Sequence, residues 1–306
     1  MRFSTIRHGP AEAGHHASSA IRVCRRLLAL ICLSATLQAE QRVTQPFIGI
    51  TYIDRTEDTP RAVHMHIAQI DLAAPGLRFK LSPPSGGREV VRQTTLEYAR
   101  QERAQLAVNA HYFLPYPSTD AEAWLVGVAV SDGRVYSAFE TPEQDYALVA
   151  YAPGVNIDPV NHASIVHRDP GHADGRHVIE PVTLWTTVAG SAQIVTDGIR
   201  SVPDLAWYDA VSARTAIGLS QDGRTLTLFT VDRSGGSDGM KVGEVADLLM
   251  RDYGVRNALN LDGGGSTTMV LQDPATHEAS IVNASSDNPA GRAVGSSLAV
   301  FARPRR

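Results

Sequence analysis

The segment NALNLDGGGSTTMV, residues 257–270, holds the residue types best suited to chemistry in this sequence. It brings the carboxylate of Asp262 to three consecutive glycines, Gly263, Gly264 and Gly265, which hydroxyl side chains follow. Three adjacent glycines lose much conformational entropy on folding, which points to a requirement beyond the fold itself. Their bare backbone would let a ligand approach closely, and its N–H groups would bind an anion. The alternative is a tight turn opened by Asp262.

Charged residues precede this segment in a fixed order. Arg214 opens the stretch RTAIGLS, Asp232 lies in VDR, and Glu244 lies in GMKVGEVADLL. Each has an ordinary interpretation: Arg214 as a surface strand residue, Asp232 as a turn or ion-pair residue, and Glu244 as part of a helix capping box. Lys241 stands where such a box requires a hydroxyl residue, so capping explains Glu244 less well.

Together with Asn109 in AVNAHYF, these motifs resemble the phosphodiester glycosidase family over about residues 62–301. The most specific part is the order R-x-A-I-G, V-D-R, G-M-x-x-x-E-x-A and N-L-D-G-G-G-S. The resemblance implies a hydrolase that cleaves a sugar, of the N-acetylglucosamine type, from the phosphate that bridges it to a second group. It implies the catalytic residues Glu244, Asp262 and Arg214. It also implies these substrate-binding residues: Asn109, His111, Gln193, Asp232, Gly263, Gly264, Gly265, Ser266, Thr267 and Arg292.

One departure from the family pattern follows Asn109. The family usually has two glycines after this asparagine, whereas this chain has Ala110 and His111. The backbone freedom expected there is reduced, because alanine and histidine adopt fewer conformations than glycine. We therefore expect the His111 side chain to occupy space near the substrate.

The bond implied by the resemblance sets what the site must supply. Cleavage between the anomeric carbon and the phosphate oxygen builds oxocarbenium-like charge on the sugar and expels a phosphate monoester. Because that leaving group is a stable anion, cation and N–H contacts matter more than a strong acid. Arg214, the glycine turn and the hydroxyls of Ser266 or Thr267 suit this role. Glu244 and Asp262 could act as base, nucleophile or cation stabiliser. We expect Arg214, Glu244 and Asp262 to converge around an anion in one cleft.

Two other classes of function stay open from the sequence. One is a non-catalytic module of the cell envelope that binds an anionic polysaccharide. The other is a metal-dependent phosphoesterase that uses Asp262, Asp232 and histidines. The glycosidase chemistry requires no cofactor, a structural or catalytic divalent cation is compatible with it, and we assign no metal ligand. The expected partner is a small molecule or polysaccharide that bears a sugar phosphodiester.

Two groups of histidines invite a metal-binding interpretation. Four recur at intervals of five residues: His162, His167, His172 and His177. That spacing matches neither a helix face nor a strand face, so we interpret this group as part of a solvated loop. His64 and His66 share one face of a predicted strand because they are two residues apart. No third ligand lies nearby in the sequence, so we interpret them as structural histidines.

Charge and composition exclude other classes. The chain has 28 basic and 32 acidic side chains and a formal net charge of −4, so it lacks the basic footprint of a nucleic-acid-binding protein. Residues 1–39 hold five arginines and an apolar run at 27–37, which predicts a secretory signal followed by a domain at 40–306. Cys24 and Cys32 both lie in this leader. No later stretch approaches the roughly 20 apolar residues of a membrane helix, so we expect an exported protein without a permanent membrane anchor.

Strands and two helices are expected to position these residues. Residue alternation and short apolar runs predict strands at 62–72, 77–81, 106–108, 255–261 and 297–301. The spacing of Thr94 and Glu97 predicts a capped helix that runs to about residue 102. An apolar stripe with helical spacing predicts a second helix from Val242, which ends at Gly254.

The order of these elements favours an α+β fold. Two pairs of residues are typical of hairpin turns and imply antiparallel strands: Asp132-Gly133 and Asp222-Gly223. Helix, strand and turn occur twice, ending once at Asn109 and once at Asp262, which suggests an internal pseudo-repeat. Residues 161–181 have little periodicity and are predicted to be an exposed connection. We therefore predict a single α+β domain with a mixed, largely antiparallel sheet and a few packed helices.

Overall fold

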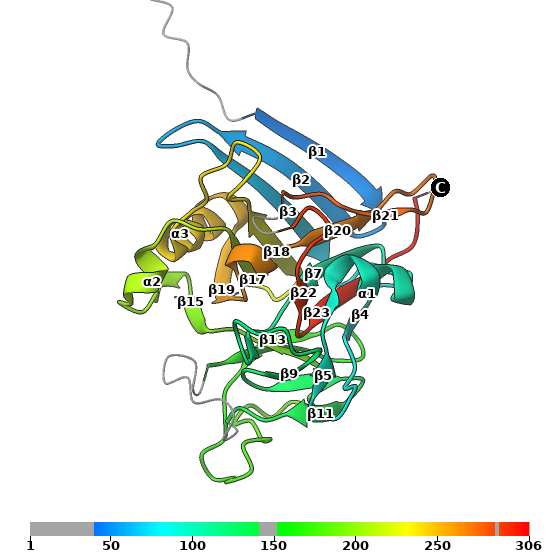
Figure 1. Ribbon diagram of the computed structural model, residues 1–306, viewed down its shortest axis with the longest axis vertical. Helices are drawn as coiled ribbons and strands as arrows, with labels where there is room; N and C mark the ends of the chain where they lie inside the picture. The colour runs from blue at the N-terminus through cyan, green and yellow to red at the C-terminus, as the bar shows by residue number, and fades with distance from the viewer. Residues whose placement is uncertain (1–39, 141–151, 285–287, 306) are drawn as a thin grey trace, which may run out of the picture. The chain divides into compact units, whose positions relative to one another are not determined.

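The computed structural model describes residues 40–140, 152–284 and 288–305. The leader predicted at residues 1–39 lies outside these ranges, together with both cysteines. Figure 1 shows the described chain as antiparallel sheets accompanied by a few short helices. Within the described ranges, every helix is too short or too polar to cross a lipid bilayer.

The largest sheet has eight strands, each antiparallel to its neighbours. In spatial order they are β1 (Glu40–Phe47), β2 (Ile50–Glu57), β3 (Val63–Asp71), β18 (Thr225–Val231), β17 (Arg214–Ser220), β19 (Val255–Asn260), β15 (Ala192–Thr196) and β16 (Ile199–Arg200). The predicted Asp222-Gly223 turn joins β17 to β18. Helix α3 (Val242–Tyr253) packs its predicted apolar stripe against β15, β17 and β19 and ends at Gly254, which has a φ of 65°.

A five-stranded antiparallel sheet carries the first helix. Its strands, in spatial order, are β21 (Ala279–Ile281), β20 (Met269–Gln272), β7 (Leu106–Asn109), β23 (Ser297–Phe301) and β4 (Arg78–Leu81). Helix α1 (Thr95–Glu102) packs on this sheet through Tyr98 and Ala99. The predicted capping box is present, because the Glu97 amide donates to the Thr94 hydroxyl at 3.1 Å and the Thr94 amide donates to the Glu97 carboxylate at 2.8 Å.

The remaining strands form a second five-stranded sheet and two small sheets. The five strands, in spatial order, are β11 (Arg134–Ser137), β10 (Ala129–Ser131), β14 (Thr186–Ala189), β12 (Gly154–Ile157) and β13 (Ala163–Val166). The small sheets are β22 (Ala293–Val294) with β6 (Gln93–Thr94), and β5 (Val90–Val91), β9 (Glu122–Leu125) and β8 (Phe113–Leu114). The predicted Asp132-Gly133 turn joins β10 to β11. Two short helical turns are α2 (Ala206–Asp209) and the 3-10 turn η1 (Gly264–Ser266).

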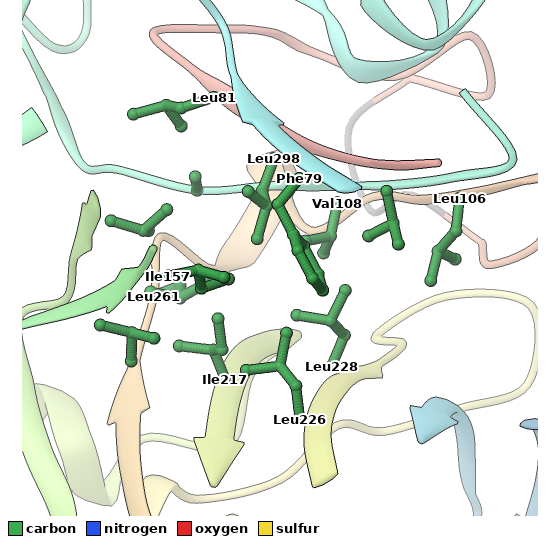
Figure 2. Close-up of a cluster of buried hydrophobic side chains, with 14 of the residues drawn as sticks. Phe79, Leu81, Leu106, Val108, Ile157, Ile217, Leu226, Leu228, Leu261 and Leu298 are labelled. Carbon is green, nitrogen blue, oxygen red and sulfur yellow. The ribbon is translucent and has the colours of Figure 1, made fainter. Parts of the chain in front are cut away.

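The main hydrophobic core lies between strands of all three larger sheets. Figure 2 shows ten of its side chains: Phe79 and Leu81 of β4, Leu106 and Val108 of β7, Ile157 of β12, Ile217 of β17, Leu226 and Leu228 of β18, Leu298 of β23, and Leu261. Strand β18 shows the alternation clearly, since Leu226 and Leu228 enter this core whereas Phe229 and Val231 pack toward α3. Each fully buried apolar side chain of this kind contributes about 1.5–3 kcal/mol. The core therefore fixes the ends of β7, β17 and β19.

The predicted α+β class is confirmed, and all strand pairings in the described ranges are antiparallel. The repeated order of helix and strand is also present, since α1 leads to β7 and α3 leads to β19. The strand predicted at residues 62–72 is β3. The prediction of an irregular connection at residues 161–181 is wrong in part, because residues 163–166 pair with β12 as β13.

Candidate active site

The turn after β19 is held in place by two other strands. The Asp262 amide donates to the Ala110 carbonyl at 3.0 Å, just beyond the end of β7. The Asn109 side-chain amide donates to the Asp262 carbonyl. The Gly264 amide donates to the Ala213 carbonyl at 2.8 Å, just before β17. The two helix–strand units thus meet at this turn, and β17 supports it from a third direction.

The fold itself requires glycine at two of the three positions. A Cβ atom at Gly263 would lie 2.9 Å from the Ala213 carbonyl oxygen, closer than real Cβ atoms approach such an atom. Gly264 has a φ of 58°, in the left-handed region that glycine adopts most easily. The turn therefore needs these two glycines for its own geometry, whatever further requirement a ligand adds.

A pocket of about 470 Å³ opens over this turn. Its lining residues are Tyr112, Phe113, Leu114, Tyr116, Val126, Trp207, Asp262, Gly263, Gly264, Gly265, Ser266 and Arg292. Part of the lining is therefore the polar glycine turn with a carboxylate and a guanidinium, and part is an aromatic wall formed by Tyr112, Phe113, Tyr116 and Trp207. A pocket of this size, apolar with a few convergent polar groups, is typical of small-molecule sites.

The Asp262 carboxyl is the titratable group best placed for chemistry in this pocket. The residue is 8% exposed, and burial raises the pKa of its carboxyl to about 7. A hydrogen bond from the Ser266 hydroxyl, the positive charge of Arg292 and the Gly263 amide oppose this rise. A carboxyl with a pKa near neutrality can exchange a proton with a reacting group at physiological pH.

Arg292 supplies the cation of the pocket. Its Nη1 atom donates to the Ser266 hydroxyl at 3.2 Å, and its guanidinium carbon lies 4.9 Å from the centre of the Tyr116 ring. Ser266 in turn hydrogen-bonds the Asp262 carboxyl. Arg292, Ser266 and Asp262 therefore form a connected polar group on the wall made by the glycine turn.

Three residues that were predicted to bind substrate are buried and hydrogen-bond to the backbone or side chains around the glycine turn: Asn109, Thr267 and Asp232. Asn109 is fully buried, and its Oδ1 accepts hydrogen bonds from the Thr215 hydroxyl at 2.9 Å and the Thr268 amide at 3.0 Å. Thr267 is 1% exposed, and its carbonyl accepts a hydrogen bond from Asn283.

Asp232 is the third of these supporting residues. Its side chain is completely buried, and its Oδ1 accepts a hydrogen bond from the Asn283 side-chain amide at 3.0 Å. The same amide donates to the Thr267 carbonyl at 3.1 Å. Asp232 therefore acts on the segment after the glycines through Asn283, and it does not line the pocket.

Arg214 lies behind the pocket wall and is not among the lining residues. It is 5% exposed, and its guanidinium donates to three backbone carbonyls: Met240 at 3.2 Å, Trp207 at 3.0 Å, and Ala210. Burial lowers the pKa of this guanidinium. In this position Arg214 fixes the α2 segment, which carries the Trp207 side chain into the pocket.

Glu244 is also absent from the pocket lining. Its carboxylate accepts a hydrogen bond from the Lys241 amide at 2.8 Å, at the start of α3, and pairs with Arg61. This is the contact of a capping residue. The expected convergence of Arg214, Glu244 and Asp262 in one cleft is therefore not observed, and Arg292 is the cation beside Asp262. A catalytic role for Glu244 or Arg214 stays a prediction.

His111 and Gln193 lie away from the pocket as well. His111 is fully buried, its Nδ1 lies 2.8 Å from the Ser296 hydroxyl, and burial lowers the pKa of its ring to about 4. Its side chain therefore stays neutral inside the protein and does not occupy substrate space as expected. The Gln193 side-chain amide donates to the Asn257 side chain at 3.0 Å, on β19.

One His–Asp cluster outside the pocket could hold a metal ion. Asp54, His64 and His66 each offer a ligand atom, and these atoms lie within 4.8 Å of one another. Asp232 lies beside both histidines, with its Oδ2 3.4 Å from His66 Nε2. The structural interpretation of His64 and His66 considered the sequence nearby alone, whereas β2 and the end of β18 bring two carboxylates beside them in the fold.

The aromatic wall of the pocket was not predicted. Three of these aromatic residues, Tyr112, Phe113 and Tyr116, lie within seven residues of Asn109. Their closeness in sequence to a predicted site residue was a signal that they could line the site. Trp207 carried no comparable signal, because it lies in the four-residue helix α2, which has no apolar periodicity.

Known proteins resemble this chain in sequence. The model of the phosphodiester glycosidase family matches residues 102–301. The mouse N-acetylglucosamine-1-phosphodiester alpha-N-acetylglucosaminidase is 46% identical over 230 residues, which cover 69% of this chain and 40% of the mouse protein. The human protein of the same name is 46% identical over 65 residues, 21% of this chain and 12% of the human protein. The chain thus spans about 40% of the length of the mouse relative.

Solved structures share the fold. The catalytic domain of the zebrafish N-acetylglucosamine-1-phosphodiester alpha-N-acetylglucosaminidase, auto-inhibited by its pro-peptide, has a TM-score of 0.56 at 22% identity, over 89% of this chain and 85% of that chain. A hypothetical protein from Synechocystis has a TM-score of 0.53 at 16% identity, over 87% and 68%. The family model covers well over half of the sequence and includes the whole glycine turn and its supporting strands. This chain therefore belongs to the phosphodiester glycosidase family.

Proposed function

We propose that the Asp262 pocket hydrolyses the bond between a sugar and the phosphate of a sugar 1-phosphodiester. The observation on which this proposal rests is the polar group formed by Asp262, Ser266 and Arg292, in a pocket that aromatic side chains also line. The products are a free sugar and a phosphate monoester. Family membership and the names of the mammalian relatives support this substrate class.

In this proposal Asp262 acts as the general base, and Arg292 stabilises the leaving phosphate. Water attacks the anomeric carbon as the bond from that carbon to the phosphate oxygen breaks, and the electron pair leaves with the phosphate. The Asp262 carboxylate takes the proton of the attacking water and later releases it to solvent. Arg292 and the Ser266 hydroxyl stabilise the negative oxygens of the leaving phosphate. Two observations support this division: the pKa of the Asp262 carboxyl is about 7, and the Arg292 guanidinium donates a hydrogen bond to the Ser266 hydroxyl.

The aromatic wall suits the sugar part of the substrate. Tyr112, Tyr116 and Trp207 line the pocket together with the glycine turn. Aromatic side chains combine a large apolar face with polar edges, which fits a sugar ring that carries both C–H and hydroxyl groups. N-acetylglucosamine is the sugar we propose, because the mouse and human relatives are named for it.

The position of the broken bond tests this proposal directly. Purified protein is incubated with the methyl phosphodiester of N-acetylglucosamine 1-phosphate in water enriched in oxygen-18, and the products are identified by mass spectrometry. We expect free N-acetylglucosamine that carries the label and unlabelled methyl phosphate. N-acetylglucosamine 1-phosphate with labelled phosphate would identify a phosphodiesterase instead. Saturable binding without turnover would identify a binding module.

Arg292 offers a test of the proposed phosphate contact. Arg292→Gln should lower kcat/KM by about 10²-fold, since it removes a charge that acts on the developing phosphate anion. Arg224→Gln, in the exposed turn between β17 and β18, is the matched control and should leave kcat/KM unchanged. Equal activity of both variants would contradict the proposed role of Arg292.

Export of the protein is part of this proposal. It rests on the order of arginines and then apolar residues within positions 1–39. Expression of the full chain in a bacterium, followed by fractionation and sequencing of the new N-terminus, tests it. We expect a processed chain that begins near residue 40 outside the cytoplasm, and an unprocessed cytoplasmic chain would contradict export.

A further inference from the structure

Four titratable side chains gather on one face of the eight-stranded sheet, outside the pocket. His64 and His66 lie on β3, Asp54 lies opposite His66 on β2, and Asp232 follows the end of β18. His66 and Asp232 are essentially buried, whereas the side chains of His64 and Asp54 are 32% and 38% exposed. The cluster is therefore open to solvent on one side and closed on the other.

The distances around Asp232 match those of a metal site. Its Oδ2 lies 3.4 Å from His66 Nε2 and 3.7 Å from His64 Nδ1. In tetrahedral zinc sites with bonds of about 2.0–2.1 Å, neighbouring ligand atoms lie about 3.3–3.4 Å apart. The two distances from Asp232 Oδ2 are therefore within a few tenths of an ångström of those in a site where one ion contacts Asp232 and both histidines.

The other ring nitrogen of each histidine is already occupied. His66 Nδ1 lies 2.7 Å from the Tyr52 hydroxyl, and His64 Nε2 lies 2.6 Å from Asp54 Oδ1. Metal-binding histidines usually hydrogen-bond through the second nitrogen in this way, which fixes the ring and its tautomer. The nitrogens that face Asp232 are consequently the ones left for an ion.

We propose that His64, His66 and Asp232 bind a divalent transition-metal ion of the zinc class, with Asp54 on the solvent side. Two carboxylates beside two histidines supply the negative charge such an ion requires. Asp54 holds the His64 ring from the solvent side through Nε2, so its carboxylate supports this ligand and does not need to contact the ion. The site is separate from the pocket, because none of its residues lines the pocket.

The bound ion would stabilise the segment after the glycine turn. Asp232 accepts hydrogen bonds from the Ala284 amide at 2.9 Å and from the Asn283 side chain at 3.0 Å. Asn283 contacts the Thr267 carbonyl and accepts a bond from the Met269 amide at 2.7 Å. An ion that fixes Asp232 therefore fixes the start of β20, and its role is structural.

Metal binding is tested on the purified protein after treatment with a chelator and dialysis. Zn²⁺ is titrated by calorimetry, and Co²⁺ by the strong visible absorption of four-coordinate cobalt. We expect one ion per chain, a cobalt spectrum of this type, and a higher Tm with Zn²⁺. No saturable binding of either ion, or a stoichiometry unrelated to one, would overturn the proposal.

Variants locate the ion. His64→Ala should abolish the cobalt spectrum, and Asp54→Asn and Tyr52→Phe should each weaken binding about 10–100-fold. Asp54→Asn and Tyr52→Phe keep side-chain size, so they decide the matter if His64→Ala folds poorly. The matched control is the double variant His172→Ala, His177→Ala, which removes a stacked, half-exposed histidine pair with its own aspartates. Binding lost in the control and kept in the other variants would overturn the assignment.

Discussion

The unit α1–β7 and the unit α3–β19 both consist of a helix followed by a strand, but the residues at the ends of the two strands have different roles. Each helix has a glutamate at its third position, and each strand is flanked by antiparallel neighbours on both sides. Beyond β7, Asn109 and His111 are completely buried, and their polar atoms bond within the protein. Beyond β19, Asp262 reaches the pocket, and its carboxyl has a raised pKa. The first unit supports the turn, and the second presents the carboxyl that we propose to act as the base.

The largest expected effect separates these two roles by activity. Asp262→Asn should lower kcat/KM on a sugar 1-phosphodiester by about 10²–10⁴-fold, because it removes the proposed base. Asp273→Asn, in the exposed turn between β20 and β21, is the matched control and should be as active as the unmodified protein. Steady-state kinetics measures both. Retention of activity in Asp262→Asn would place the chemistry elsewhere in the molecule.

The supporting role of the first unit predicts a loss of stability. Asn109→Ala should lower the free energy of unfolding by about 2–4 kcal/mol, because three buried partners lose their hydrogen bonds: the Asp262 carbonyl, the Thr215 hydroxyl and the Thr268 amide. Urea unfolding measures this change. Asn257→Ala, at a less buried position on β19, is the control and should lower the free energy of unfolding by less than Asn109→Ala does. Equal costs would mean that Asn109 has no special structural role.

The pH dependence of stability should distinguish Asp262 from an ordinary surface acid. The pKa of its carboxyl is about 7 in the folded protein and about 3.9 in an unfolded chain. The carboxyl therefore stays protonated to a higher pH in the folded state than in the unfolded state. The contribution of Asp262 to the free energy of unfolding therefore falls between about pH 4 and pH 7. Asp262→Asn should be more stable than the unmodified protein by about 4 kcal/mol at pH 8, and the difference should shrink toward pH 4. A difference independent of pH would contradict the raised pKa.

The smallest expected effect concerns Glu244, the residue of the second unit that corresponds to Glu97. Glu244→Gln removes the ion pair with Arg61 but keeps an oxygen for the Lys241 amide, so we expect a loss of stability of about 0.5–1 kcal/mol. Activity should stay within about twofold, as for a residue that makes no contact in the transition state. Thermal unfolding and steady-state kinetics measure the two. Loss of most of the activity in Glu244→Gln, with the fold intact, would restore the catalytic role that the family resemblance implies.

Local signals predicted the elements well. The capping box of α1, the apolar stripe of α3, the Asp-Gly turns and the glycine turn each depend on residues close together in the sequence, where physical preferences act directly. These signals also predicted that Asp262 ends a strand at a special turn.

The directions of side chains could not be predicted in the same way. Glu244 pairs with Arg61, a residue 183 positions away, and Asp232 meets His66 across 166 positions. Such contacts depend on strand order and register, which a single sequence leaves open. The ordered motifs include Asp262 and the glycine turn, which line the pocket, but they could not separate Arg292, which also lines it, from Arg214, which does not.

Arg214 suggests where differences in substrate preference within such a pocket could originate. Its guanidinium joins the Trp207 and Ala210 carbonyls to the Met240 carbonyl. The position of the pocket wall on the tryptophan side thus depends on an interior side chain that does not itself line the pocket. A search for residues that determine selectivity should therefore extend to the interior anchors of each wall, because a change at such an anchor moves the whole wall without altering any surface that the sugar contacts.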